Sequence, residues 1–138
     1  MHEAPYNREI VDLHQFFEDW FTGKLDLTDA NFRRFESVIA DGFALIDPGG
    51  VITERETLIP RLRAAHNTRP NVRVWIENIR LHHYVGDILL VTYEEWQQSG
   101  DQTTARLSTA LFRDKPDAPN GLEWLHVHET WLPDRAPV

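Results

Sequence analysis

The sequence predicts an α+β fold in which three N-terminal helices pack on a strongly bent, mainly antiparallel sheet. Two observations lead to this prediction. Before Pro70, apolar residues recur mostly at helical spacing, whereas from Val72 nearly to the end they alternate with a period of two. A short hairpin interrupts the helices, and turn residues divide the second half into four long strands. We therefore expect two layers, with the helices covering one face of the sheet.

The first two helices are predicted from the spacing of their apolar residues. Gly23 lies close to the expected end of the first helix, whose apolar stripe consists of Ile10, Leu13, His14, Phe17, Trp20 and Phe21. Thr28 or Asp29 is a suitable N-cap for the second helix, which carries Phe32, Phe35, Val38 and Ile39. Each helix would bury one apolar face.

A hairpin and a third helix follow. The turn sequence at residues 47–50 separates a short apolar strand at residues 43–46 from a return strand that begins at Val51. Thr53 and Glu56 have the spacing of a capping box, which would start a helix carrying Leu58, Ile59, Leu62 and Ala65. We expect this helix to end by Pro70, before the long strands begin.

The second half of the chain is predicted to be an antiparallel meander. Its strands are expected over residues 72–85, 87–98, 103–113 and 122–132. Tight-turn sequences separate the first three strands, whereas residues 115–121, with two prolines, form a longer loop. The apolar phase slips near Glu77 and Asn78, where the sequence leaves open a β-bulge that would bend the sheet.

Composition limits the class of protein. The 138 residues are 41% hydrophobic, which suits a single domain over residues 1–138. A net charge of −8 argues against nucleic-acid partners and anionic membrane surfaces, which reward clustered lysine and arginine. The sequence contains no cysteine, which excludes disulfides and thiolate chemistry. No apolar run could span a bilayer and no signal sequence is recognisable, so we expect a cytoplasmic protein.

Strict alternation sorts the side chains of the last strand onto two faces. One face would carry Leu125, Val127, Glu129 and Trp131, and the other Trp124, His126, His128 and Thr130. If the apolar face is the core, the carboxylate of Glu129 points into it. Burying a carboxylate costs free energy unless it is paired, hydrogen-bonded or protonated. The sequence therefore predicts a partner or a wet cavity beside Glu129.

Cross-strand pairing extends this inner surface. A hairpin turn at Gly100-Asp101 would place Glu95 opposite Arg106. The register of the last strand is left open, but any register that keeps Leu125 and Val127 on the apolar face also brings Glu129 near Arg106 and Ser108. The apolar surface would then consist of Leu89, Val91, Ala110, Phe112, Leu125 and Val127. Its polar end would consist of Tyr93, Glu95, Arg106, Ser108 and Glu129. An apolar cavity with convergent polar groups is typical of small-molecule sites.

This order of elements resembles the nuclear transport factor 2-like proteins, particularly their SnoaL-like and ketosteroid-isomerase-like branch, over nearly the whole chain. Residues 109–113 followed by 124–128 are similar to the last two strands of the association domain of calcium/calmodulin-dependent kinase II. The resemblance implies a cone-shaped fold, a pocket between helices and sheet, and dimers through the outer sheet face. Thr109 stands where the association-domain pattern carries an arginine, so anion binding by that arginine is not carried over. The superfold hosts both enzymes and non-catalytic binders.

Two functional hypotheses stay open. In the first, the domain is a cofactor-free isomerase, dehydratase or cyclase in which Glu129 is the general base and His14 faces it across the pocket. The ligand would be small and apolar to amphipathic, and would contact Phe17, Tyr93, Glu95, Arg106, Ser108 and Val127. In the second, the domain is a non-catalytic binding or assembly module. His14 would then be a satisfied core histidine, and an ion-paired Glu95, Arg106 and Glu129 would keep both carboxyls ionised and poor as acids.

The outer face of the sheet is predicted to be a homodimer interface. It would carry Trp96, Leu107, Leu111, Trp124, His126 and His128, an unusually large apolar surface for a monomer. At a dimer seam, acid would charge the two histidines and weaken the dimer. The pair also has metal-like spacing, with Glu94 on the neighbouring strand, but two imidazoles make a weak motif and no metal site is expected.

Four arginines crowd the segment of the third helix. They are Arg55, Arg61, Arg63 and Arg69, and they are interleaved with Glu54 and Glu56. This mixture favours a solvated helix face over a phosphate-binding site.

Overall fold

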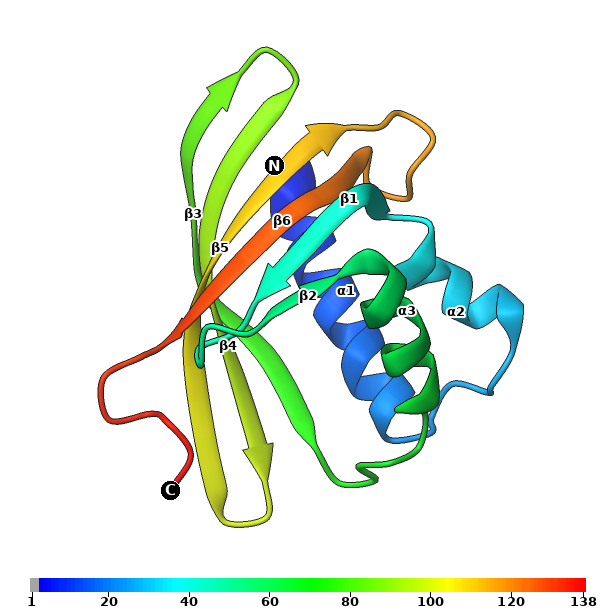
Figure 1. Ribbon diagram of the computed structural model, residues 1–138, viewed down its shortest axis with the longest axis vertical. Helices are drawn as coiled ribbons and strands as arrows, with labels where there is room; N and C mark the ends of the chain where they lie inside the picture. The colour runs from blue at the N-terminus through cyan, green and yellow to red at the C-terminus, as the bar shows by residue number, and fades with distance from the viewer. Residues whose placement is uncertain (1–2) are drawn as a thin grey trace.

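Three helices lie against one face of a six-stranded sheet in the computed structural model, which describes residues 3–138 (Figure 1). The helices are α1 (Pro5–Phe21), α2 (Asp29–Glu36) and α3 (Arg55–Ala64). The strands are β1 (Ile39–Ile46), β2 (Ile52–Glu54), β3 (Arg73–Val85), β4 (Ile88–Ser99), β5 (Gln102–Asp114) and β6 (Leu122–Trp131). The predicted α+β class is confirmed, and the four long strands lie where the alternation placed them.

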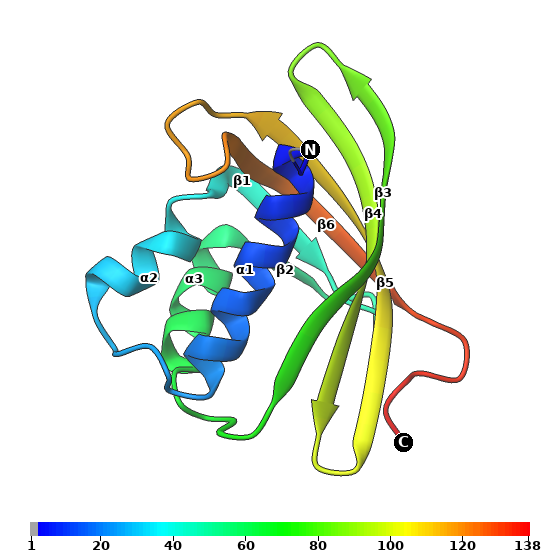
Figure 2. The ribbon, with the colours of Figure 1, turned by 180° about the vertical axis from the view of Figure 1, so that it is seen from behind.

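The sheet forms one wall of a cone and the helices close the other. Its strand order is β2-β1-β6-β5-β4-β3, with β1 and β6 parallel and every other neighbouring pair antiparallel. The β3–β4 and β4–β5 hairpins extend beyond the helices at opposite ends of the molecule (Figure 1). From behind, the bent sheet curls around α1, and all three helices lie on its concave side (Figure 2). Within residues 3–138, no helix lies on the outer face of the sheet.

Irregular pairing bends β3. Its register with β4 shifts between Glu77 and Arg80, and again between Leu81 and His83. Asn78, inside the first shift, has a φ of 55°, in the left-handed region that single bulge residues often adopt. The bulge that the sequence left open near Asn78 is therefore present, and it helps to close the cone.

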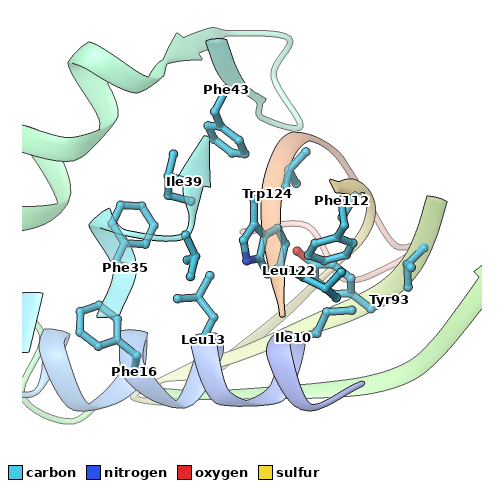
Figure 3. Close-up of a cluster of buried hydrophobic side chains, with 14 of the residues drawn as sticks. Ile10, Leu13, Phe16, Phe35, Ile39, Phe43, Tyr93, Phe112, Leu122 and Trp124 are labelled. Atoms are coloured by element: carbon cyan, nitrogen blue, oxygen red, sulfur yellow. The ribbon is translucent and has the colours of Figure 1, made fainter. Parts of the chain in front are cut away.

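The hydrophobic core lies between α1 and the inner face of the sheet. Ile10, Leu13 and Phe16 project from α1 toward side chains of β1, β4, β5 and β6 (Figure 3). Trp20 is fully buried in the last turn of α1, and its indole N–H donates to the Leu62 carbonyl at 2.8 Å, which ties α1 to α3. Each large apolar side chain buried in this way contributes about 1.5–3 kcal/mol.

Val38 and Ile39 do not belong to the second helix, contrary to the prediction. α2 ends at Glu36, and Ile39 is the first residue of β1. The Val38 carbonyl accepts a hydrogen bond from the backbone N–H of Trp124 at 2.7 Å. β-branched side chains favour extended backbone, and this pairing with β6 reinforces that preference over the helical spacing.

The capping box predicted at Thr53 is also wrong. Thr53 pairs with Leu45 in the β1–β2 ladder, and the N-cap of α3 is Glu54, whose side chain makes no capping bond. The Thr53 hydroxyl instead accepts a hydrogen bond from Arg61 at 3.4 Å. The short strand therefore takes the residue that would otherwise have capped the helix.

Trp124 points into the core, not onto the outer face as the alternation predicted. In the β5–β6 ladder Phe112 pairs with Trp124 and Leu111 pairs with His126, so Leu125 is an extra residue in a β-bulge. The bulge shifts the period of two by one position, and the inward-facing residues of β6 are Leu122, Trp124, Val127 and Glu129. Leu125, predicted on the inner surface, is only half-buried.

Candidate functional site

A cavity of about 330 Å³ opens between the helices and the inner face of the sheet. Most of its wall is apolar and comes from α1, β1, α3 and β6; it includes Leu13, Phe17, Phe43, Leu58, Trp124 and Val127. Polar side chains also reach the cavity, namely His14, Arg69, Tyr93, Glu95, Gln97, Arg106 and Glu129. Cavities of this size and composition are typical of small-molecule sites.

His14 and Glu95 form a buried ion pair on the cavity wall. His14 Nε2 lies 3.1 Å from Glu95 Oε1, and His14 Nδ1 lies 2.7 Å from the carbonyl oxygen of Ile10. Burial alone would lower the pKa of His14, but the charge and hydrogen bond of Glu95 outweigh it and raise the pKa. Burial would raise the pKa of Glu95, but its pairing with His14 lowers the pKa to about 2. The His14 ring therefore faces Glu95, not Glu129 as the sequence analysis had placed it.

Glu129 is the second carboxyl in the cavity. It lies near Arg106 and Ser108, as expected: it pairs across strands with Ser108 and accepts a hydrogen bond from Arg106 Nη1 at 3.0 Å. Burial and the negative charge of Glu95 raise the pKa of Glu129 to about 7, although Arg106 opposes the shift. The expectation that both carboxyls stay ionised therefore holds for Glu95, mainly because of His14, and not for Glu129.

Tyr93 and Ser108 complete the polar end in different ways. Burial raises the pKa of Tyr93 well above its ordinary value, so its phenol stays neutral, and its ring packs 5.3 Å from that of His14. Ser108 is fully buried behind Glu129, with its hydroxyl 3.5 Å from the carboxyl, and does not reach the cavity wall. Ser108 was predicted as a ligand contact, and the structure makes it a support for Glu129.

Three of the cavity residues that the sequence analysis missed carry hydrogen-bonding groups. Gln97 follows Glu95 at a spacing of two on β4, so period two alone could have found it. Arg69 was assigned to a solvated helix face, but it lies beyond α3 and is half-buried at the cavity. Trp124 was hidden by the bulge at Leu125, which leaves no signal in the sequence.

The outer face carries most of the residues predicted for it. Trp75 stacks on Trp96 with ring centroids 6.0 Å apart, and Leu107 is 37% exposed. The C-terminal segment crosses one end of this face, where the Arg135 guanidinium lies 5.0 Å from the Trp96 ring. Among residues 3–138, no group of three or more His, Cys, Asp and Glu side chains could hold a metal ion.

Comparison with known proteins identifies the family. Residues 6–133 match the family described as sucrose-6-phosphate phosphohydrolase C-terminal. The chain belongs to this family. Sucrose-phosphatase 1 of Nicotiana tabacum is 28% identical over 127 residues, which are 90% of this chain and 30% of that protein. The chain thus spans less than a third of the length of the curated relatives it matches.

Solved structures agree with the fold. An NTF-2-like protein of unknown function from Pseudomonas aeruginosa is 26% identical, with a TM-score of 0.83, over 94% of this chain and 99% of that one. The hub of calcium/calmodulin-dependent kinase II from S. rosetta, at 15% identity, has a TM-score of 0.57 over 80% of this chain and 95% of that one. The predicted nuclear transport factor 2-like fold is confirmed. None of the helices within residues 3–138 has the length and apolar character needed to cross a membrane.

Proposed function

We propose that this domain binds a small molecule with an apolar body and a polar group in the cavity between helices and sheet. The observation that carries the proposal is the cavity itself, a space of about 330 Å³ with an apolar wall and convergent polar groups. The apolar body would lie against Phe17, Trp124 and Val127. Its polar group would reach Arg106 and Glu129.

The polar groups of the cavity are held in place before any ligand arrives. Glu95 is fixed by His14 on one side and by the Gln97 amide, which donates at 2.6 Å, on the other. Within residues 3–138, Arg106 donates its hydrogen bond only to Glu129, although a guanidinium has five N–H groups. Spare donors on a fixed side chain favour ligand binding, because little conformational entropy is lost.

Filling the cavity tests this proposal. Val127→Phe adds bulk to the cavity wall, and Val51→Phe, at an exposed turn position, is the matched control. We expect wild-type protein and the control to bind decan-1-ol in a calorimetric titration, and the filled variant to lose at least tenfold in affinity while keeping its circular dichroism spectrum. Native mass spectrometry would show whether a co-purifying molecule is lost in parallel. Unchanged binding by folded Val127→Phe protein would contradict the proposal.

Proton transfer by Glu129 is a second candidate function, favoured by its pKa of about 7 in an apolar cavity. A carboxyl that titrates near neutral pH suits a general base or acid in a cofactor-free isomerisation, dehydration or cyclisation. His14 would then act through Glu95, whose charge raises the pKa of Glu129, and not as the base itself. Isomerisation of a β,γ-unsaturated ketone is a direct probe. Glu129→Gln should lower its rate by about 10²–10⁴-fold, and a rate unaffected by this change would exclude the role.

For the outer face we propose a second copy of this chain as the partner. The interface would use Trp96, Leu107, His126 and His128, and Trp124 is no longer part of it because it lies in the core. The stacked Trp75 and Trp96 rings and the exposed Leu107 favour association over solvent exposure. The likeness of fold to a kinase hub is in keeping with assembly through this domain.

Sedimentation equilibrium tests the interface. We expect a dimer at pH 8 that Leu107→Glu disrupts, because a charged side chain would be buried in the interface. Val85→Glu, at the exposed tip of the β3–β4 hairpin, is the control and should leave the dimer intact. A monomeric wild-type protein at pH 8, or a dimer that Leu107→Glu leaves unchanged, would contradict this assignment.

A further inference from the structure

A second cavity adjoins the first beside the β4–β5 hairpin. It has a volume of about 280 Å³ and shares three wall residues with the first cavity, namely Arg69, Gln97 and Arg106. Its other walls are mostly neutral hydrogen-bonding side chains, among them Ser99 and Thr104, with the ring of Trp131. The two cavities therefore differ in character, and the side chains that separate them are polar.

Both guanidinium groups at this boundary have unused donors. Arg69 donates from Nη1 to Gln97 Oε1 at 3.1 Å, and within residues 3–138 no carboxylate lies within 4.0 Å of it. Arg106 is held by Glu129 and by the Trp131 ring, whose centroid is 4.8 Å from its guanidinium carbon. Each guanidinium has five N–H groups, so most of them remain for a ligand.

The local charge is positive although the chain is acidic. Arg69 and Arg106 lie on the walls of both cavities, whereas the carboxyls of Glu95 and Glu129 lie on the first cavity alone. Among the described residues, the second cavity has no carboxyl on its wall. The whole chain has a net charge of −8. A positive site inside an acidic protein selects for anions.

We propose that the second cavity binds the carboxylate or phosphate of an amphipathic ligand whose apolar body lies in the first cavity, with Arg69 and Arg106 as the donors. The guanidinium fork matches the oxygen spacing of both anions, which makes arginine the usual residue for such recognition. This inference rests on the proposed small-molecule function and adds the chemical class of the ligand, an amphipathic anion. It also replaces the solvated-face interpretation of Arg69 with a binding role.

Matched amphiphiles test the anion site. Decan-1-ol, decanoate and decyl phosphate share one apolar chain and differ in the polar end, so their affinities isolate the contribution of that end. We expect wild-type protein to bind at least one of the anions about tenfold or more tightly than the alcohol. Arg69→Gln should bring the anions to within about twofold of the alcohol, whose own affinity should not change. The anion that loses more affinity in this variant identifies the preferred group.

Arg33→Gln is the control for a lost positive charge, since Arg33 is exposed on α2, away from both cavities. It should keep the wild-type preference for anions. Equal affinity of wild-type protein for all three compounds, or an anion preference that survives Arg69→Gln, would overturn the anion site and leave the apolar pocket standing. Failure of wild-type protein to bind any of the three would overturn the proposed function and the inference with it.

Discussion

Two buried carboxylates in this domain differ in how completely they are paired. Glu9 of α1 is fully buried and accepts hydrogen bonds from both Nη atoms of Arg34, from Asn120 and, at 2.8 Å, from the Trp124 indole. Glu129 has one short bond from Arg106 and a long one from Ser108, and it borders a cavity. Both Glu9 carboxylate oxygens already accept hydrogen bonds from protein donors, which makes Glu9 a structural residue. Incomplete satisfaction beside empty space leaves Glu129 available for a ligand or a proton.

Removing Glu9 should give the largest loss of stability. Glu9→Ala leaves the partly buried Arg34 without its counter-charge, and the free energy of unfolding should fall by about 3–5 kcal/mol. Urea unfolding followed by circular dichroism measures this loss. Asp12→Ala is the control, because Asp12 is exposed on the same helix and also accepts a bond from Asn120. Equal losses in the two variants would break the distinction between the carboxylates.

The second-largest expected effect is a dependence of the free energy of unfolding on pH that comes from Glu129. Because the folded pKa of Glu129 is about 7 and the ordinary value is 4.5, folding favours its protonated form. Its contribution to stability is therefore complete below pH 4.5 and is lost as the pH rises through 7. Glu129→Gln cannot lose a proton, so its stability relative to wild type should improve by about 3 kcal/mol between pH 4 and pH 8.

Urea titrations of both proteins at the two pH values check this change. Other titrating groups are common to the two proteins and cancel to first order in the difference. A difference that stays constant with pH would show that Glu129 titrates normally and would remove the basis for a proton-transfer role.

Trp124 connects the two carboxylates, since its indole N–H bonds Glu9 while its ring lines the cavity. Trp124→Phe keeps a ring but leaves one Glu9 oxygen with fewer donors, and should cost about 1–3 kcal/mol. In the Glu9→Ala background the further loss should be smaller, because the bond is already absent. Additive losses in this double-mutant cycle would show that the indole bond contributes nothing.

An exposed ion pair gives the smallest expected effect. Arg63 of α3 and Asp29 of α2 pair on the surface, where the Asp29 side chain is 78% exposed and water screens both charges. Asp29→Asn should cost less than about 1 kcal/mol in the same urea assay. A loss as large as that of Glu9→Ala would mean that burial is not what distinguishes the carboxylates.

Residues whose position depends on local periodicity were predictable from sequence. The stripe of α1 and the pairing of Glu95 with Arg106 follow from helical spacing and from the hairpin register, and the structure has both. Alternation also put Glu129 near Ser108, but its exact partner came only from the structure. The inward turn of Trp124 was not predictable, because a bulge is decided by packing against Phe112 and by the bond to Glu9. Arg69 was missed for a similar reason, since a loop residue reaches a cavity only through the tertiary fold.

The roles of the cavity residues remain predictions, because sequence and geometry place side chains without naming a ligand. The partner of His14 is an example of what the sequence alone could not decide. Helical spacing put this residue on the buried face of α1 correctly, but only the three-dimensional arrangement distinguishes Glu95 from Glu129 as its acceptor. This choice of partner matters for the chemistry, because Glu95, which pairs with His14, has a pKa of about 2, whereas the pKa of Glu129 is about 7.

The extra residue at Leu125 makes this point of β6 tolerant of a change in chain length. Deleting that single position would remove the bulge and restore strict alternation, with Trp124, Val127 and Glu129 still on the inner face. A one-residue deletion in a regular part of the strand would instead turn every side chain on one side of the deletion to the opposite face. A domain of this shape could therefore lose a residue at the bulge, within a single genetic event, and keep its internal pocket.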